Sequence, residues 1–317
     1  MRSRDHYTPR VTHRSAASET WTTRRLLTWM GQTFAAKGLE SPRLMAEMLM
    51  AHVLGCERLR LYMDVDRPAS PLEREALRDL VARALKHEPV QYLVGEAWFY
   101  GLPFHVDPRV LIPRPSTESM VQEVLQHHRA RHGAAGQDGR GVMIADVCTG
   151  SGCIAVALLK NLPEARAVAT DLSTEALEVA RRNAARHGVS ERVEFLAGDL
   201  LTPVLAHAAA GKAGALDFLV SNPPYIPDDE WPHQVGRNVL DHEPHLALRG
   251  GADGLDHVRR LLNDGPALVK PGGLVLVEVA TSRARAAASL ASGAGLGHVR
   301  VVRDHEGLDR VIVGERA

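Results

Sequence analysis

The sequence lacks long apolar stretches, an excess of charge of either sign, and a cysteine framework. No run reaches the roughly 18 apolar residues that a membrane-spanning helix needs, so no membrane association is expected. The 38 basic residues equal the 38 acidic ones, which argues against a broad nucleic-acid surface. The three cysteines form no disulfide pattern, which fits a reducing cytoplasm. Cys148 and Cys153 lack the spacing of a zinc site, so no metal is predicted.

Apolar residues, in contrast, are abundant enough to form a large core. The chain has 317 residues, of which 45% are hydrophobic, and this length suits about two domains. Residues 1–20 are polar and Arg-rich without an apolar centre, so they predict a disordered extension and not a secretory signal.

The next segment, residues 21–95, carries apolar residues at helical spacing and predicts a small helical domain. One helix begins at Ser41-Pro42 and another at Ser70-Pro71, where Ser70 suits the N-cap and Pro71 the first turn. Residues 96–112 predict two short strands around a turn at Gly101-Leu102-Pro103, which we interpret as a β-hairpin linker between domains.

The remainder, residues 113–317, alternates between strand and helix patterns. This alternation is typical of an α/β fold, a doubly wound parallel sheet covered by helices on both faces. Helices are expected after Gly152 and at residues 174–187, 201–210 and 255–268. Strands are expected at residues 142–147, 165–170, 192–196, 216–220 and 274–279, with a closing pair at 299–302 and 310–313.

The most informative stretch is Asn222-Pro223-Pro224-Tyr225, which directly follows the predicted strand at 216–220. The prolines lack a backbone N–H and have a fixed φ, so they end the strand in a stiff turn. This turn leaves the Asn222 side chain and the Pro223 carbonyl free to accept both hydrogens of a substrate NH2 group. Tyr225 supplies a flat apolar wall beside them. The alternative is a turn that only ends the strand.

A second candidate site follows the first strand of the alternating region. Asp146 opens a glycine-rich turn at residues 148–152, which lets a ligand approach the backbone closely. Asp171 ends the second strand, where a carboxylate can hold a ribose diol, and Asp199 ends the third, where it can accept from an adenine amino group. The same turn fits a nicotinamide dinucleotide fingerprint, but a dehydrogenase needs no clamp for an NH2 group. In a doubly wound sheet the two loops would meet across one crevice.

Several motifs together resemble the S-adenosylmethionine-dependent methyltransferases, and more narrowly the protein-(glutamine-N5) methyltransferases. They cover roughly residues 25 to 315. The motifs are Glu88-Pro89-Val90-Gln91-Tyr92, Val110-Leu111-Ile112-Pro113-Arg114-Pro115, Gly150-Ser151-Gly152, Asn222-Pro223-Pro224-Tyr225, and Asp241-His242-Glu243-Pro244 with Gly250-Gly251-Ala252-Asp253-Gly254-Leu255.

The resemblance implies a seven-stranded class I (Rossmann-like) catalytic domain, S-adenosylmethionine as cofactor, and an N-terminal helical domain that docks the substrate. The implied reaction methylates a glutamine side-chain amide in a translation protein, above all the Gly-Gly-Gln glutamine of release factors. The implied acceptor and catalytic residues are Asn222, Pro223 and Tyr225, with Pro224 also contacting the glutamine. The implied cofactor residues are Asp146, Cys148, Thr149, Gly150, Ser151, Gly152, Asp171, Asp199, Leu200 and Asn222.

Three positions depart from the pattern of the resembled family: Ser116 stands for a usual Glu, Ala280 for a usual Gly, and Cys148 for a common Gly. Cys148 is shared with a sister group that modifies a large-subunit ribosomal protein, so such a protein is a second possible target. Adenine-N6 DNA methylation, nicotinamide-dependent oxidoreduction and non-catalytic binding in translation are competing functions. We expect a cytoplasmic monomer with a release factor or ribosomal protein as partner and no direct nucleic-acid contact.

Overall fold

The computed structural model of the chain describes residues 20–133, 141–211, 215–231, 233 and 235–317. The chain divides into two compact units, Met1–Lys86 and His87–Ala317. The predicted extension at residues 1–20 lies outside the described residues apart from Thr20. In the described ranges, no helix is both long and apolar enough to cross a membrane.

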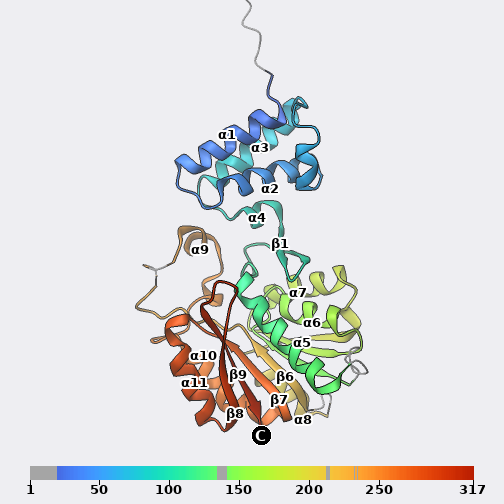
Figure 1. Cartoon of the computed structure of the whole chain (residues 1–317), viewed down its shortest axis with the longest axis vertical. Helices are drawn as coiled ribbons and strands as arrows, with labels where there is room; N and C mark the ends of the chain where they lie inside the picture. Colours follow the sequence, from blue (N-terminus) through green and yellow to red (C-terminus); the bar gives the residue numbers. More distant parts are fainter. Residues whose placement is uncertain (1–19, 134–140, 212–214, 232, 234) are drawn as a thin grey trace, which may run out of the picture. The chain divides into compact units, whose positions relative to one another are not determined.

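The N-terminal unit is helical, as its apolar spacing predicts (Figure 1). Its elements are α1 (Thr23–Ala36), α2 (Pro42–Leu54), the 3-10 helix η1 (Arg58–Tyr62) and α3 (Pro71–Ala84). Met30 and Phe34 of α1 are fully buried, as is Leu49 of α2. The predicted start of α3 is confirmed: the Ser70 side chain accepts from the Glu73 backbone N–H, and the Glu73 carboxylate accepts from the Ser70 N–H, which forms a capping box.

The predicted β-hairpin is confirmed, but its turn lies earlier than expected. Strands β1 (Glu96–Phe99) and β2 (Leu102–His105) pair antiparallel, with Phe99 opposite Leu102, so only Tyr100 and Gly101 form the turn. Both have positive φ, 50° and 73°, which matches a two-residue hairpin turn. Pro103 was expected in the turn but pairs with Trp98 in the strand, where an edge position needs no N–H.

The segment before the hairpin, which is the end of the predicted helical domain at residues 21–95, packs with residues of the larger unit. Helix α4 (Val90–Val94) lies just after the division between the units. The Tyr92 hydroxyl donates to the Val110 carbonyl at 2.6 Å. Tyr92 also packs in one buried cluster with Val106 and Val179. These contacts tie α4 to the larger unit.

The larger unit is built on the predicted α/β sheet, part of which is labelled in Figure 1. The sheet has seven strands in the order β5-β4-β3-β6-β7-β9-β8. All neighbours pair in parallel except β9, which runs antiparallel to β7 and β8. The strands are β3 (Met143–Val147), β4 (Arg166–Asp171), β5 (Val193–Ala197), β6 (Leu216–Ser221), β7 (Val269–Glu278), β8 (Leu296–Arg303) and β9 (Asp309–Arg316).

Helices cover both faces of the sheet because successive strand residues point to opposite sides. Phe218 and Val220 of β6 pack against α5, α6 and the end of α7, whereas Leu219 packs against α8, α10 and α11. These helices are α5 (Glu118–His132), α6 (Cys153–Asn161), α7 (Thr174–Arg186), α8 (Thr202–Ala209), α10 (Asp256–Asp264) and α11 (Ala284–Gly293). Shorter elements are η2 (Pro115–Thr117), η4 (Ser190–Arg192), α9 (Arg237–His242), η5 (His245–Ala247), η6 (Gly265–Leu268) and η7 (Thr281–Arg283).

The prediction for residues 255–279 was partly wrong. The expected helix at 255–268 ends at Asp264 and continues as the 3-10 helix η6, because Pro266 has no N–H to donate to a longer α-helix. The following strand begins at Val269, five residues before the predicted start, and Val269 pairs with Leu216 ahead of a bulge. Gly272 and Gly273 concealed this part of the strand, since glycine is unfavourable in a strand pattern.

Candidate active site

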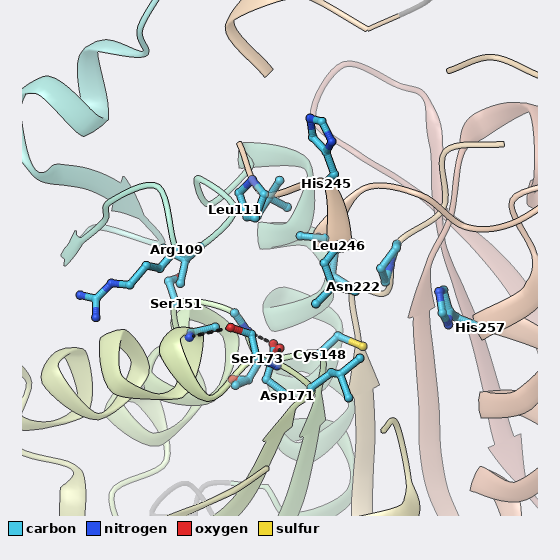
Figure 2. Close-up of a pocket in the computed structure, with 18 of the residues that line it drawn as sticks. Arg109, Leu111, Cys148, Ser151, Asp171, Ser173, Asn222, His245, Leu246 and His257 are labelled. Carbon is cyan, nitrogen blue, oxygen red and sulfur yellow. Dashed lines mark hydrogen bonds between the residues drawn. The ribbon is translucent and has the colours of Figure 1, made fainter. Parts of the chain in front are cut away.

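The loops after β3 and β6 meet at the carboxyl edge of the sheet, as predicted from the expected strand order. Val147 pairs with Ser221, and the Ser221 hydroxyl donates to the Val147 carbonyl at 2.7 Å. The strand order reverses at β3, which is where ligands bind in doubly wound sheets. A cavity of about 860 Å³ lies between these loops (Figure 2). Its volume suits a small-molecule ligand.

Most of the predicted site residues line this cavity. They are Cys148, Thr149, Gly150, Ser151, Asp171, Asp199, Leu200, Asn222 and Pro224. Four others lie behind the wall or beside it: Asp146, Gly152 and Pro223 are buried, and Tyr225 lines a smaller adjoining cavity. The structure therefore brings both predicted half-sites together around one volume.

The glycine-rich turn has a left-handed backbone at three positions. The φ angles are 61° at Cys148, 53° at Gly150 and 79° at Gly152. A Cβ on Gly152 would approach the Ala180 Cβ to 3.1 Å, so glycine also permits close packing of the turn on α7. Cys148 stands at a position where glycine is common, and an L-residue with this φ costs about 1–3 kcal/mol. Burial raises the pKa of the Cys148 thiol, which keeps it protonated and unreactive.

Asp146 supports this turn from behind. One of its oxygens accepts from the Thr149 hydroxyl at 2.7 Å and from the Ala155 N–H at 3.0 Å. The other oxygen has no hydrogen-bond partner among the described residues. Burial raises the pKa of Asp146 to about 7, and the two hydrogen bonds partly oppose this rise. Its position indicates that Asp146 shapes the turn.

Asp171 lies at the end of β4 and lines the cavity. One carboxylate oxygen accepts from the Gly150 N–H and the other from the Ser173 N–H, both at 2.9 Å (Figure 2). A carboxylate offers about four lone-pair sites, so acceptor capacity remains for a ligand diol. Burial raises the pKa of Asp171, and the backbone N–H groups oppose the rise.

Asp199 also lines the cavity, but its carboxylate already has a partner. The Arg260 guanidinium donates to both of its oxygens, at 2.6 and 3.3 Å. An adenine amino group would have to share this acceptor with Arg260. The neighbouring Leu200 has a positive φ of 47°, so strained backbone occurs on both sides of the cavity.

Asn222 is held by residues that sequence analysis missed. Its Nδ2 donates to the Thr117 hydroxyl at 3.1 Å, and that hydroxyl donates to the Glu278 carboxylate at 2.6 Å. The Tyr225 hydroxyl donates to the other Glu278 oxygen at 3.2 Å. Glu278 is fully buried. An acidic residue at the end of an apolar strand was an available signal, because buried charges require partners.

Asn222 lies on the wall shared by two cavities. The smaller one, of about 240 Å³, is also lined by Tyr225, Arg114, Val239 and Leu248. Residues of the glycine-rich turn line the larger cavity, and Tyr225 lines the smaller one. The two cavities share Leu111, Arg114, Asn222 and Ala247 in their walls, so a ligand in either cavity can lie beside Asn222.

A second loop, at residues 250–254 and called the glycine loop below, holds the corner at Pro224 and Tyr225 in place. Ile226 accepts from the Gly250 N–H at 2.8 Å and donates to the Leu248 carbonyl at 2.9 Å. A Cβ on Gly250 would lie 2.7 Å from the Tyr225 Cα, and one on Gly254 would lie 2.5 Å from the Tyr225 carbonyl oxygen. Only glycine permits this approach, which gives a physical reason for the glycines in the last motif.

Two further motifs are joined by a buried carboxylate. Glu243 accepts from the Ile112 N–H at 3.1 Å and from the Arg114 guanidinium at 2.6 Å. Its side chain has no exposed surface, so the ion pair also satisfies a backbone donor in the interior. This pair joins two segments of the cavity wall, the one that contains Arg114 and the one that contains Pro244.

Neither Ser116 nor Ala280, the other two departures, lines either of the two cavities. Ser116 is half-buried, and its carbonyl accepts from the Ser119 hydroxyl at 2.7 Å. Ala280 has φ −62° and ψ 140°, a conformation open to any residue, so glycine is not required there.

Comparison with known proteins identifies the chain's relatives. Residues 25–95 match the family described as PrmC N-terminal domain, and residues 136–253 match the methyltransferase small domain. A release factor glutamine methyltransferase of Chlorobaculum tepidum is 44% identical over 92% of this chain and 96% of its own length. That of Geobacter sulfurreducens is 41% identical over 93% of this chain and 97% of its own length.

Solved structures share the fold at low identity. The human METTL16 catalytic domain, in complex with a MAT2A 3′UTR hairpin, has a TM-score of 0.52 at 14% identity. The match covers 69% of this chain and 77% of that one. The human METTL16 N-terminal domain in complex with SAH has a TM-score of 0.50 at 17% identity, over 76% of this chain and 84% of that one.

These similarities place the chain among the S-adenosylmethionine-dependent methyltransferases. The cavity fits that cofactor: the glycine turn lets a ligand approach the backbone, and Asp171 keeps acceptor capacity for a ribose diol. At 44% identity over almost the whole of a relative, the chain belongs to the release factor glutamine methyltransferase family.

Proposed function

We propose that this protein methylates the side-chain amide nitrogen of a glutamine in a release factor, the glutamine of its Gly-Gly-Gln segment. The observation that carries the proposal is the Asn222 carboxamide on the wall shared by two cavities. Its Nδ2 is engaged by Thr117, so its Oδ1 points elsewhere and is available as an acceptor. The names of the curated relatives support the same substrate class.

The proposed chemistry relies on positioning. An amide nitrogen is a weak nucleophile because its lone pair is delocalised into the carbonyl. Asn222 Oδ1 and the Pro223 carbonyl, accepting its two hydrogens, would favour a pyramidal nitrogen with its lone pair directed at the methyl donor. In-line positioning of this kind contributes roughly 7–11 kcal/mol. S-adenosylmethionine, when bound, supplies an electrophilic methyl group on a sulfonium. No general base is needed, since the amide proton leaves to water after transfer.

The two cavities divide the roles in this proposal. The larger one would hold the cofactor on residues 148–152, with Asp171 on its ribose. The smaller one would admit the glutamine beside the Tyr225 ring. Asp199 and Leu200 would line the adenine side. Asp146, Gly152 and Pro223 do not line either cavity, so the role of Asp146 and Gly152 in this proposal is to shape the turn, and that of Pro223 rests on its backbone carbonyl.

We further propose a cytoplasmic monomer that contacts a protein partner and not nucleic acid. The equal numbers of acidic and basic residues support the part of this proposal that concerns nucleic acid. We assign substrate docking to the helical segment at residues 21–95, which matches the PrmC N-terminal domain.

Asn222→Asp tests the function proposed for the corner. The variant keeps an acceptor but adds a charge, so turnover on a release factor should fall at least about 100-fold, a loss expected for a key transition-state contact. Cofactor affinity by isothermal titration should stay close to wild type. Asn263→Asp, at an exposed position of α10, is the matched control and should change neither quantity. Equal losses of turnover and cofactor affinity in Asn222→Asp would contradict the assignment.

A further inference from the structure

The side chains of Thr117 and Glu278, with that of the half-buried Tyr225, form a hydrogen-bond network beside Asn222, and the proposed reaction gives Thr117 and Glu278 no role. Thr117 is 2% exposed and Glu278 is fully buried. Thr117 comes from η2, Glu278 from the end of β7, and Asn222 from the loop after β6, so three separate elements converge. Burying a carboxylate is costly, and its position beside the acceptor corner calls for an explanation.

The direction of the hydrogen bonds in this network follows from the donors available. A carboxylate only accepts, and a threonine hydroxyl has one proton. Thr117 gives that proton to Glu278 at 2.6 Å, which leaves its oxygen only lone pairs to offer Asn222. The Asn222 group that faces Thr117, at 3.1 Å, must therefore be the donating Nδ2. The carboxamide oxygen is then directed away from Thr117.

We propose that Thr117 and Glu278 are positioning residues that set the orientation of the Asn222 carboxamide, so that its oxygen and not its nitrogen faces the methyl acceptor. Without this constraint, the carboxamide has two orientations that differ by a half-turn about its last bond. One orientation offers an acceptor to a substrate NH2 group, and the other offers a second donor that would repel it. The inference rests on the proposed function for its substrate and on the structure for the network.

Tyr225 completes the arrangement. Its hydroxyl donates to the second Glu278 oxygen, so each carboxylate oxygen has a donor. Burial raises the pKa of the Glu278 carboxyl, and the hydrogen bonds from Thr117 and Tyr225, together with the Arg310 and Arg114 guanidiniums, oppose this rise. The charged form is the one that can accept from Thr117 and Tyr225 together, so the network holds both the Asn222 amide and the Tyr225 ring.

The test compares Thr117→Val with Thr117→Ser. Valine keeps the shape of threonine but has no acceptor for Nδ2, whereas serine keeps the hydroxyl. Loss of one such hydrogen bond is expected to reduce kcat about 10-fold in Thr117→Val, with the cofactor dissociation constant unchanged. Thr117→Ser should retain kcat within about threefold of wild type. Equal kcat losses in both variants, or a wild-type kcat in Thr117→Val, would overturn the proposal.

A second measurement needs no substrate and separates this inference from the proposed function. The side-chain NH2 signal of Asn222 in a 15N-labelled protein can be assigned by its absence in Asn222→Asp. Its hydrogen exchange should be on the order of fivefold faster in Thr117→Val than in wild type or Thr117→Ser. Equal exchange in all three would refute the network even if methylation occurs. If wild type does not methylate a release factor but the exchange differs as expected, the proposed function fails and the positioning role of Thr117 stands.

Glu278→Gln probes the carboxylate itself. Its carboxamide keeps the shape but leaves one acceptor oxygen for two hydroxyl donors. Exchange of the Asn222 NH2 should therefore lie between the wild-type and Thr117→Val rates. Thermal unfolding checks that the variant is folded, and a folded variant with wild-type exchange would remove Glu278 from the proposal.

Discussion

At the scale of single residues, Asp146 shows how a group that does not line the cavity can still determine the site. It braces the glycine turn through Thr149 and Ala155. Burial raises its pKa from 3.8 to about 7. The folded protein thus binds a proton that the unfolded chain releases between these values. The stability contributed by this proton is fully present below pH 3.8 and is lost as the pH rises through about 7.

The loss of this stability with rising pH predicts how Asp146→Asn, which cannot ionise, differs from wild type. As the pH rises from about 5 to about 8, wild type loses the stability of the Asp146 proton and the variant does not. The Tm of the variant minus the Tm of wild type should therefore increase over this range. Calorimetry at several pH values measures it. Asp229→Asn, at an exposed position, is the control for the removal of a carboxyl group from the surface. A constant difference for Asp146→Asn would show that its carboxyl is not the group described.

The residues around Asn222 also show what sequence reasoning can and cannot reach. The Asn222 to Tyr225 corner was predictable because prolines after an apolar strand leave few conformations. Thr117 and Glu278 were not identified, since they lie 161 positions apart and bond only after the sheet has formed. Spacing along a chain does not report such a contact. Only the isolated acid in an apolar strand pointed towards it.

At the scale of elements, the close packing of the glycine loop on the corner at Pro224 and Tyr225 predicts that a larger residue at Gly250 displaces the corner. Gly250→Ala places a methyl group 2.7 Å from the Tyr225 Cα and 2.9 Å from the Pro224 carbonyl oxygen, so the corner must shift. Overpacking of this kind costs about 1–3 kcal/mol of stability. Misplacing the corner should also lower turnover, by on the order of 100-fold for a shift near 1 Å. Thermal unfolding and methyl transfer measure the two effects.

Gly293→Ala is the matched control for that substitution. Gly293 ends α11, and outside its chain neighbours and its own helix backbone no described atom lies within 4 Å of the position where its Cβ would be. Alanine should leave turnover unchanged and raise stability slightly, because glycine is a poor helix former. Loss of activity in Gly293→Ala, or none in Gly250→Ala, would argue against the close approach at the corner.

Element boundaries were harder to predict than the elements themselves. The order of strands and helices followed from the alternation of apolar patterns. The ends shifted where glycine or proline masked the pattern, as at Gly272 in β7 and Pro103 in β2. In both cases pairing with a neighbouring strand outweighed the local preference.

At the scale of the whole molecule, the unit His87–Ala317 contains the entire cavity and the buried clusters on both faces of the sheet. A fragment of residues 87–317 should therefore fold and bind S-adenosylmethionine. At about 100 times its dissociation constant, the cofactor should stabilise the fragment by about 2.7 kcal/mol, as it should the full chain. The fragment should methylate an intact release factor more slowly than the full chain. A fragment that folds but binds no cofactor would contradict this division.

The most direct test of the central claim is mass spectrometry of a release factor after incubation with the protein and S-adenosylmethionine. We predict the gain of one methyl group, located by fragmentation on the glutamine of the Gly-Gly-Gln segment and absent when Asn222→Asp replaces the wild type. A methyl group on any other residue, or an equal yield from Asn222→Asp, would contradict the account.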